Sequence, residues 1–223
     1  MKAKIDSSTV MIPVGREGIY GDLALPETPK ALVIFAHGSG SSRFSPRNRY
    51  VAEILNESGF ATLLIDLLTS DEERVDIATA EYRFNIHLLA QRLVIATDWA
   101  LPDSRLLHLP LGYFGASTGA AAALIAATKR SHNVAAIVSR GGRPDLAADD
   151  LPKVSAPTLL IVGEFDRDVI ELNQQAALQM RSLTDIKIIR GATHLFEEEG
   201  ALEQVASLAS QWFETNLFRE RAA

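Results

Sequence analysis

The residues best suited to chemistry in this chain are a serine, an aspartate and a histidine, and each follows a short apolar run. Ser117 lies in the pentapeptide Gly-Ala-Ser-Thr-Gly (115–119), a G-x-S-x-G pattern between an apolar run and an alanine-rich segment. A serine between a strand and a helix in this pattern is held in a strained turn that exposes its Oγ. The flanking glycines allow the tight turn and the close approach of the following helix. Ser117 is therefore the candidate nucleophile.

Asp166 and His194 provide the two further groups that a serine nucleophile needs. A serine hydroxyl is a weak nucleophile at neutral pH and needs a base, and free imidazole suits because its pKa is about 6.5. A carboxylate must then hold the imidazole in the correct tautomer and stabilise the imidazolium. The chain order of serine, aspartate and histidine is the order found in α/β-hydrolases.

Other residues compete for the acid and base roles. Glu164 and Asp168 flank Asp166, but Asp168 lies nearer to the next expected helix, where a carboxylate suits the first turn. Asp166 lies deeper in the turn, from which it can face His194. His37 follows an early apolar run, and we expect it to make structural hydrogen bonds or to contact substrate. The remaining histidines are interpreted as surface or packed residues: His87, His108 and His132.

Two backbone N–H groups are predicted to bind the oxyanion that forms when the serine attacks a carbonyl. The N–H of Thr118 follows the nucleophile and opens a helix whose dipole favours negative charge. The N–H of Ser39 is the second candidate, because it lies in a glycine- and serine-rich run (37–42) after an early apolar run. Removing one such donor typically costs about 3 kcal/mol of transition-state stabilisation.

Several arginines follow the same apolar runs and could bind a carboxylate or phosphate of a substrate. Arg43, Arg140 and Arg143 are candidate substrate-binding residues, and the alternative is that they carry surface charge or tie loops together. Arg47 and Arg49 are interpreted as surface charges or as residues that tie loops together.

Apolar runs alternate with helical patterns along the chain, and these elements must position the candidate residues. The expected strands are 9–14, 19–25, 31–36, 61–65, 111–114, 134–138, 158–162 and 186–189, and the expected helices are about 47–58, 81–100, 118–130, 169–183 and 201–217. The first two strands suit an antiparallel pair, and the later, near-continuous apolar runs suit buried parallel strands. This pattern predicts a single α/β domain over residues 1–223, with a doubly wound, mostly parallel sheet and no sizeable lid domain. Ligands bind such sheets at the carboxyl ends of the strands.

Composition excludes several classes of function. A net charge of −6 provides no basic surface for nucleic acid or for an anionic membrane. The chain has no cysteine, which rules out disulfides, thiol nucleophiles and cysteine-bound metals. No apolar run approaches the ~18 residues of a membrane-spanning helix, and residues 1–8 lack the apolar core of a signal peptide, so we expect a cytoplasmic protein. The acidic runs 71–73 and 197–199 are expected at solvated helix starts, and they lack metal-ligand spacing, so no metal or cofactor is expected.

Four segments together resemble the dienelactone hydrolase family of the α/β-hydrolases. These segments are 37–48, 115–119, 163–166 and 191–196, and the resemblance covers nearly the whole chain. Segments 39–43 and 139–144 resemble, more narrowly, the small hydrolase domains found fused to phosphoribosyltransferases. The resemblance implies the α/β-hydrolase fold and assigns the triad and the oxyanion donors to the same five residues. This chain departs from the family in having serine where dienelactone hydrolases use a cysteine nucleophile, so a dienelactone substrate does not follow.

The residues therefore predict a serine hydrolase that cleaves short-chain carboxylic esters or lactones through an acyl-enzyme, with a small-molecule substrate and no cofactor. A peptidase, an amidase or an acyltransferase could use the same triad, and a non-catalytic binding module could keep the fold. The predicted loops are short, and the helix expected at 81–100 is the only sizeable element that could shade an otherwise open site. The sequence leaves the oligomeric state open.

Overall fold

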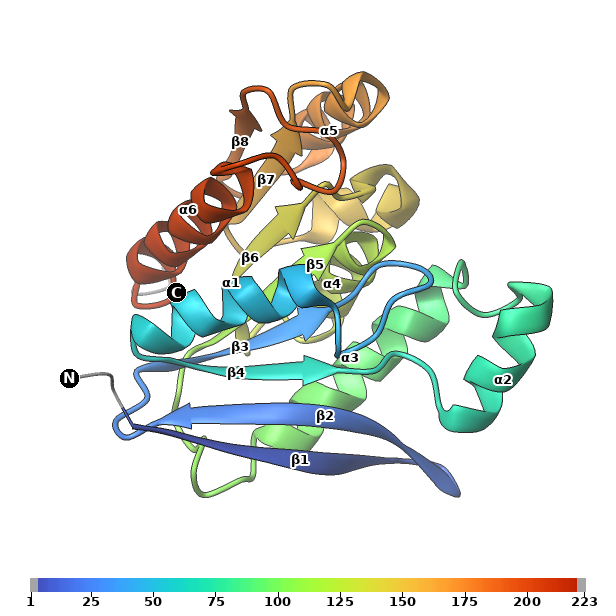
Figure 1. Ribbon diagram of the computed structural model, residues 1–223, viewed down its shortest axis with the longest axis vertical. Helices are drawn as coiled ribbons and strands as arrows, with labels where there is room; N and C mark the ends of the chain where they lie inside the picture. The colour runs from blue at the N-terminus through green and yellow to red at the C-terminus, as the bar shows by residue number, and fades with distance from the viewer. Residues whose placement is uncertain (1–3, 220–223) are drawn as a thin grey trace.

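The strands of this computed structural model, which describes residues 4–219, form one eight-stranded sheet (Figure 1). The strands are β1 (Ile5–Val14), β2 (Glu17–Pro26), β3 (Ala31–Ala36), β4 (Phe60–Ile65), β5 (Leu111–Ala116), β6 (Val134–Arg140), β7 (Thr158–Gly163) and β8 (Thr184–Ile189). Their order across the sheet is β1-β2-β4-β3-β5-β6-β7-β8. β1 pairs antiparallel with β2 and β2 pairs antiparallel with β4, whereas every later pair is parallel. The predicted mostly parallel sheet with an antiparallel N-terminal pair is confirmed.

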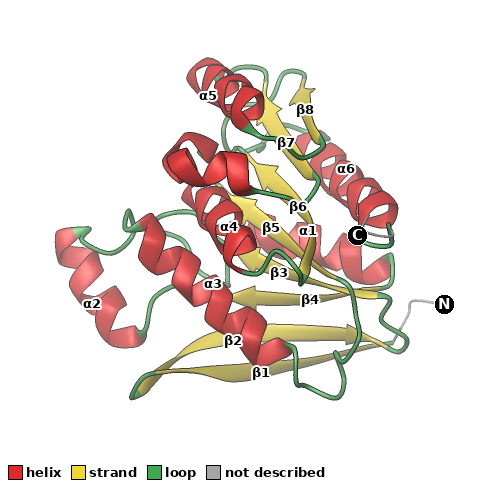
Figure 2. Ribbon diagram, turned by 180° about the vertical axis from the view of Figure 1, so that it is seen from behind, coloured by secondary structure: helices red, strands yellow, loops and turns green. Residues whose placement is uncertain are grey.

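Helices cover both faces of the sheet. They are α1 (Pro46–Glu57), α2 (Ser70–Thr79), α3 (Ile86–Ala100), α4 (Thr118–Lys129), the 3₁₀ helix η1 (Pro144–Lys153), α5 (Arg167–Gln179) and α6 (Ala201–Asn216). α1 and α6 lie on one face, and α3, α4 and α5 lie on the other, as Figures 1 and 2 show from opposite sides. α2 projects beyond the carboxyl end of β4 and covers neither face (Figure 1). Among residues 4–219, no helix combines the length and the apolar character needed to cross a membrane.

Continuous apolar strands are buried on both sides because each face carries its own apolar core. All residues of β3, β4, β5 and β7 are buried. Side chains alternate between the two cores along β5: Phe114 stacks on Phe35 with ring centroids 4.8 Å apart on the α1–α6 side. Tyr113 faces the other core, where its hydroxyl bonds to the hydroxyl of Thr97. This alternation anchors β5 in both cores, directly before the turn that carries Ser117.

The region between β4 and α3 differs from the prediction. The helix expected at 81–100 starts only at Ile86, and a separate helix, α2, precedes it. α2 begins with a capping box between Thr69 and Glu72 and ends where Ala80 takes a left-handed conformation with φ 56°. Its only buried residue is Asp76, so the segment lacks the apolar stripe from which helices are predicted. Hydrogen bonds and caps, rather than apolar burial, form this helix.

The other predicted elements lie close to the observed ones. The strand expected at 9–14 begins earlier, at Ile5, and the helix expected at 169–183 ends earlier, at Gln179. The acidic run 71–73 lies in the first turn of α2, as expected, but the run 197–199 precedes Gly200, the residue that caps α6, and lies outside that helix. The 3₁₀ helix η1 was not predicted, and Pro152 within it breaks a helical pattern.

Candidate active site

Ser117 lies between β5 and α4 in a strained backbone conformation, with φ 50° and ψ −120°. A positive φ is unfavourable for a residue with a side chain and persists only where the surroundings enforce it. The neighbouring glycines do so: a Cβ on Gly119 would lie 2.4 Å from the backbone oxygen of Ala36. A Cβ on Gly115 would lie 2.5 Å from the Cα of Ala120. The backbone therefore has room for this turn only where these two residues are glycine.

Asp166 and His194 meet at the carboxyl ends of β7 and β8. Nδ1 of His194 lies 2.6 Å from Oδ2 of Asp166, and the two side chains are 38% and 15% exposed. Asp166 is at the N-cap position of α5 but makes no capping hydrogen bond, so its carboxylate is free to face the imidazole. Asp168 lies in the first turn of α5, and Glu164 accepts a hydrogen bond from the N–H of Gly191. Of the three acidic residues weighed from the sequence, Asp166 is the one bonded to His194.

The segment that follows β6 lies between the serine and the histidine. The N–H of Ser117 donates to the backbone oxygen of Arg140, and the N–H of Arg143 donates to the backbone oxygen of Ser117. A Cβ built on Gly141 would lie 3.5 Å from Cε1 of His194. Ser117 and His194 therefore flank the same short segment. Because Nδ1 of His194 faces Asp166, Nε2 is the ring nitrogen left for the serine.

The two predicted oxyanion donors also lie at this edge. A Cβ on Gly38 would lie 3.1 Å from Cβ and 3.8 Å from Oγ of Ser117, so the loop after β3 passes directly over the Ser117 side chain. The N–H of Ser39 donates to Oγ1 of Thr118 at 2.9 Å. The N–H of Thr118 lies in the first turn of α4, where backbone donors have no partner within the helix. The structure thus brings both residues to the serine, with the Ser39 donor engaged by the Thr118 hydroxyl.

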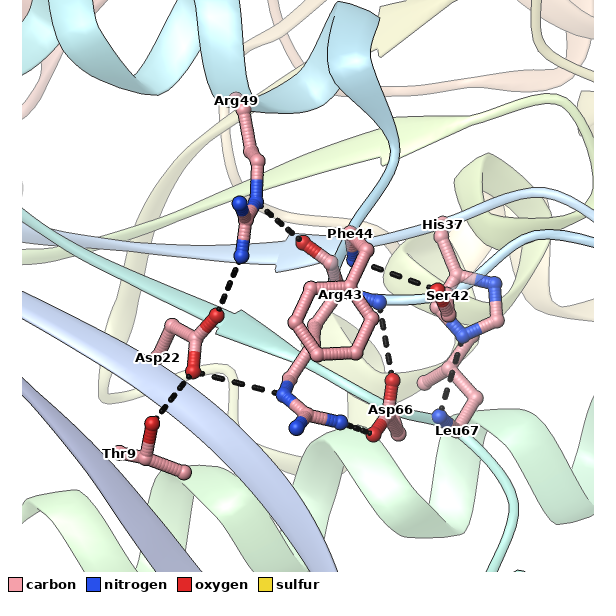
Figure 3. Close-up of polar contacts among 9 residues, drawn as sticks. All are labelled: Thr9, Asp22, His37, Ser42, Arg43, Phe44, Arg49, Asp66 and Leu67. Atoms are coloured by element: carbon pink, nitrogen blue, oxygen red, sulfur yellow. Dashed lines mark hydrogen bonds and ion pairs between the residues drawn. The ribbon is translucent and has the colours of Figure 1, made fainter.

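His37 joins this loop to the connection between β4 and α2 (Figure 3). Its Nε2 accepts a hydrogen bond from the N–H of Leu67 at 3.2 Å, and Nδ1 lies 2.8 Å from the backbone oxygen of Gly38. This pattern requires the proton on Nδ1, which donates to Gly38. Burial lowers the pKa of His37, against raising effects from the Gly38 carbonyl and the Asp66 carboxylate. Both ring nitrogens of His37 are therefore used within the protein.

Arg43 and Arg143 are each paired with a carboxylate. Arg43 donates through its backbone N–H and its guanidinium to Asp66, and its Nε lies 3.4 Å from Asp22 (Figure 3). Its guanidinium also lies 4.0 Å from the ring centroid of Phe44. Arg143 makes two hydrogen bonds with Asp145, of 2.9 and 2.8 Å. The contacts of Arg43 tie separate segments together, which is the alternative that the sequence left open, whereas Arg143 pairs locally with a residue in the first turn of η1.

The surroundings of Arg140 are different. This residue is 6% exposed, and within residues 4–219 its Nε and Nη1 atoms are buried without a hydrogen-bond partner. Its guanidinium lies 5.9 Å from the ring centroid of Phe196. Burial, and to a lesser extent nearby Arg47, lowers the pKa of Arg140 to about 10, so the side chain is still charged at neutral pH. Arg140 is thus a buried cation with unused donors, one strand away from Ser117.

A cavity of about 300 Å³ lies beside the loop after β3. Its lining consists of His37, Gly38, Ser39, Gly40, Ser41, Leu67, Leu68, Glu73, Asp76, Ile77, Arg83 and Leu89. The sequence analysis missed this cavity because it missed α2, which forms the outer wall. The signal that could have found α2 is the run Thr69-Ser70-Asp71-Glu72, a threonine followed three residues later by glutamate, which is a capping-box pattern. In the part of the chain that the structure describes, no cluster of three or more histidine or acidic side chains could hold a metal ion.

Solved structures share this fold. The crystal structure of a dienelactone hydrolase from Anabaena variabilis is 55% identical and superimposes with a TM-score of 0.93, over 95% of this chain and 98% of that one. Est1E from Butyrivibrio proteoclasticus is 18% identical and has a TM-score of 0.78, over 94% of this chain and 98% of that one. The second likeness extends the shared fold to a distant relative.

Sequence comparisons give the family. Two Mycobacterium tuberculosis proteins, which bear the name phosphoribosyl transferase and come from two strains, are 55% identical over 204 residues. The match covers 92% of this chain and 45% of those proteins, so the chain spans less than half the length of these curated relatives. Residues 19–220 match the model of the dienelactone hydrolase family. Because that match takes in nearly all of the sheet and the entire edge around Ser117, the chain belongs to the dienelactone hydrolase family.

Proposed function

We propose that this chain is a serine hydrolase that cleaves carboxylic esters or lactones through an acyl-enzyme on Ser117. The observation that carries the proposal is the placement of a strained elbow serine and a histidine–aspartate pair on either side of one short segment. Membership of a hydrolase family supports the same reaction class. The triad, rather than the fold, carries the argument, because one fold hosts many functions.

In the acylation step, Oγ of Ser117 attacks the carbonyl carbon while Nε2 of His194 takes the hydroxyl proton. Asp166, on Nδ1 of the ring, holds the tautomer that leaves Nε2 free to accept and stabilises the imidazolium that forms. The N–H groups of Thr118 and Ser39 donate hydrogen bonds to the negatively charged carbonyl oxygen. For this, the N–H of Ser39 releases the Thr118 hydroxyl and donates to the oxyanion instead. The bond to the alcohol then breaks, and the imidazolium returns its proton to the leaving alcohol oxygen.

In the deacylation step, a water molecule attacks the acyl carbon and gives its proton to Nε2 of His194. The same two N–H groups bind the second oxyanion. The bond between the acyl carbon and Oγ of Ser117 breaks, the serine recovers its proton from His194, and the carboxylic acid leaves. For a lactone, the alcohol and acid are one molecule. Side chains, backbone N–H groups and water provide every group that these steps use.

Short acyl chains suit this site best in the proposed reaction. The cavity beside the serine holds about 300 Å³, enough for a ring or a short chain. Each methylene group left in water forgoes roughly 0.8 kcal/mol of burial. We therefore expect kcat/KM to be highest for acetyl to butyryl aryl esters and to fall for chains of about eight carbons or more.

The direct test uses a fluorophosphonate probe and the Ser117→Ala variant. We expect the wild-type protein to be labelled on Ser117, and the variant to lose labelling and at least ~10³-fold of ester turnover with an unchanged circular dichroism spectrum. Labelling that persists in the variant would show that another residue is the nucleophile.

A substrate panel tests the reaction class. For para-nitrophenyl esters, a steady rise in catalytic efficiency from acetate to palmitate would contradict the short-chain preference. Faster cleavage of matched anilides than of esters would favour an amidase or peptidase. Transfer of the acyl group to an added alcohol in preference to water would favour an acyltransferase.

A further inference from the structure

The cavity beside the loop after β3 lies within reach of a substrate held on Ser117. Gly38 and Ser39 form its inner side, and the Cβ position of Gly38 is 3.8 Å from Oγ of Ser117. Glu73 and Ile77 of α2 lie on its outer side. One of the two substituents of a carbonyl under attack at Ser117 can therefore extend into this cavity.

Most of the titratable side chains that line the cavity are neutral or neutralised. His37 uses both ring nitrogens within the protein, and burial favours its uncharged form. Asp76 is 4% exposed and lies 2.7 Å from Nε of Arg83, whose Nη2 also donates to the backbone oxygen of Asp76. The backbone N–H groups of Tyr82 and Arg83 donate to the same carboxylate. The charges of Asp76 and Arg83 thus cancel next to the cavity.

Glu73 is the remaining charge. Its side chain is exposed at the cavity wall, and no side chain within residues 4–219 pairs with it. The arginines of α2 and α3 are paired with other residues: Arg74 with Asp71, and Arg92 with Glu72. The cavity therefore carries one net negative charge at its wall.

We propose that this cavity binds an uncharged, ring-sized substituent of the substrate ester and that Glu73 excludes carboxylates from it. The proposal rests on the proposed function and adds a substrate class: neutral rather than acidic esters. Leu67, Leu68 and Leu89 provide apolar contact for the substituent. A carboxylate in the same place is repelled by Glu73 through a partly solvated path, which we expect to disfavour acidic esters on the order of ten-fold.

The experiment compares kcat/KM for two isosteric ester pairs in which a carboxamide replaces a carboxylate. In one pair the group is on the acyl side, in the phenyl monoesters of terephthalamic acid and terephthalic acid. In the other pair the group is on the alcohol side, in the acetates of para-hydroxybenzamide and para-hydroxybenzoic acid. The para position keeps the carboxylate from attacking its own ester. We expect the carboxamide to be preferred by about ten-fold in the pair whose substituent enters the cavity, and less so at high salt.

Variants then assign the preference to Glu73. Glu73→Gln should reduce it to about two-fold or less, and Glu73→Lys should reverse it. Glu81→Gln removes the same charge from the loop after α2, outside the cavity lining, and should leave the preference unchanged. Both positions are exposed, and the free energy of unfolding of each variant checks that the fold is kept.

Three results would overturn the proposal: equal hydrolysis within both pairs, a preference that survives in Glu73→Gln, or fluorophosphonate labelling of Ser117 with no turnover of any of these esters. Absence of both labelling and turnover would instead overturn the proposed function, and the inference would fall with it.

Discussion

The edge of the sheet that carries Ser117 has two walls that are built in different ways. The wall at the ends of β5, β7 and β8 is set by backbone packed against backbone: a Cβ on Gly119 would lie only 2.4 Å from the backbone oxygen of Ala36. The wall formed by α2 is held by polar side chains: a capping box from Thr69 and Glu72, the pair of Glu72 with Arg92, and the pair of Asp76 with Arg83. Backbone packing permits one arrangement, whereas a contact between two side chains can be removed or exchanged by a single substitution.

We expect this difference to separate the residues that set the reaction rate from the residues that set substrate selectivity. Ser117, Asp166 and His194 come from the rigid wall, where a displacement of one ångström would greatly reduce the rate. Glu73 and Ile77 come from the polar wall, where we expect a change of side chain to alter the cavity without moving Ser117. We therefore expect substitutions in the rigid wall to reduce the reaction rate strongly. We expect substitutions in the polar wall to change substrate binding moderately.

The largest expected effect tests the catalytic pair on the rigid wall. Asp166→Asn should reduce kcat/KM by ~10³–10⁴-fold, because an amide cannot hold the imidazole of His194 in the productive tautomer. Asp168→Asn should stay within about three-fold, since Asp168 lies in the first turn of α5 and is not bonded to His194. Measuring kcat/KM of both variants on one short-chain aryl ester decides which aspartate is the acid. Reversed losses would make Asp168 the acid.

The second effect concerns the packing that holds the elbow. Gly119→Ala should reduce the free energy of unfolding by more than ~3 kcal/mol, because its Cβ would overlap backbone that has no space to move. Gly15→Ala is the matched control: its φ is 60°, but nothing lies within 4 Å of a Cβ there. The control should lose only ~1 kcal/mol from backbone strain. If urea unfolding showed similar losses of unfolding free energy in the two variants, the backbone around Gly119 would be able to move and accommodate a Cβ.

The rigid wall could be predicted from the sequence because its causes are local. Glycines at 115 and 119 follow an apolar run and precede alanines, so strand, turn and helix are all encoded within a few residues. The apolar runs of β3, β5 and β7 are continuous because both faces of each strand are buried, and a continuous run is easy to recognise.

The polar wall could not be predicted in the same way. α2 has no apolar stripe, and Asp76 accepts hydrogen bonds from residues six and seven positions along the chain. The partners of the arginines could not be predicted either. Arg43 pairs with Asp66, 23 positions away in the sequence, whereas Arg140 pairs with no carboxylate within the described residues 4–219. The two arginines thus differ through partners that only the folded chain brings near.

The third effect tests whether the polar wall opens independently. Burial opposes ionisation of Asp76, but hydrogen bonds from Arg83 and Tyr82 outweigh it and hold the pKa of Asp76 below its ordinary value. Asp76→Asn should therefore loosen α2, with amide hydrogen exchange in residues 70–85 at least ~10-fold faster. KM for ring-bearing neutral esters should rise by a similar factor, while fluorophosphonate labelling of Ser117 stays within about three-fold. Asp71→Asn, on an exposed pair with Arg74, should change neither quantity. Slower labelling in step with faster exchange would show that the two walls move together.

The smallest expected effect concerns His37, which joins the walls through Gly38 on one side and Leu67 on the other. Burial lowers the pKa of His37 in the folded protein, so the unfolded chain takes up the proton first as the pH falls. The free energy of unfolding should therefore decrease below about pH 6.5, by at most ~1.4 kcal/mol per pH unit from this residue, and the decrease should stop below the folded-state pKa. His37→Gln removes the titrating group and should flatten this part of the pH dependence, whereas His87→Gln, on the exposed side of α3, should keep it. Urea unfolding at pH 7.5, 6.5 and 5.5 measures the free energy of unfolding of each variant. The contributions of the other titrating groups cancel when the two variants are compared. If His37→Gln kept the wild-type slope, the lowered pKa of the buried His37 ring would not be the source of this pH dependence.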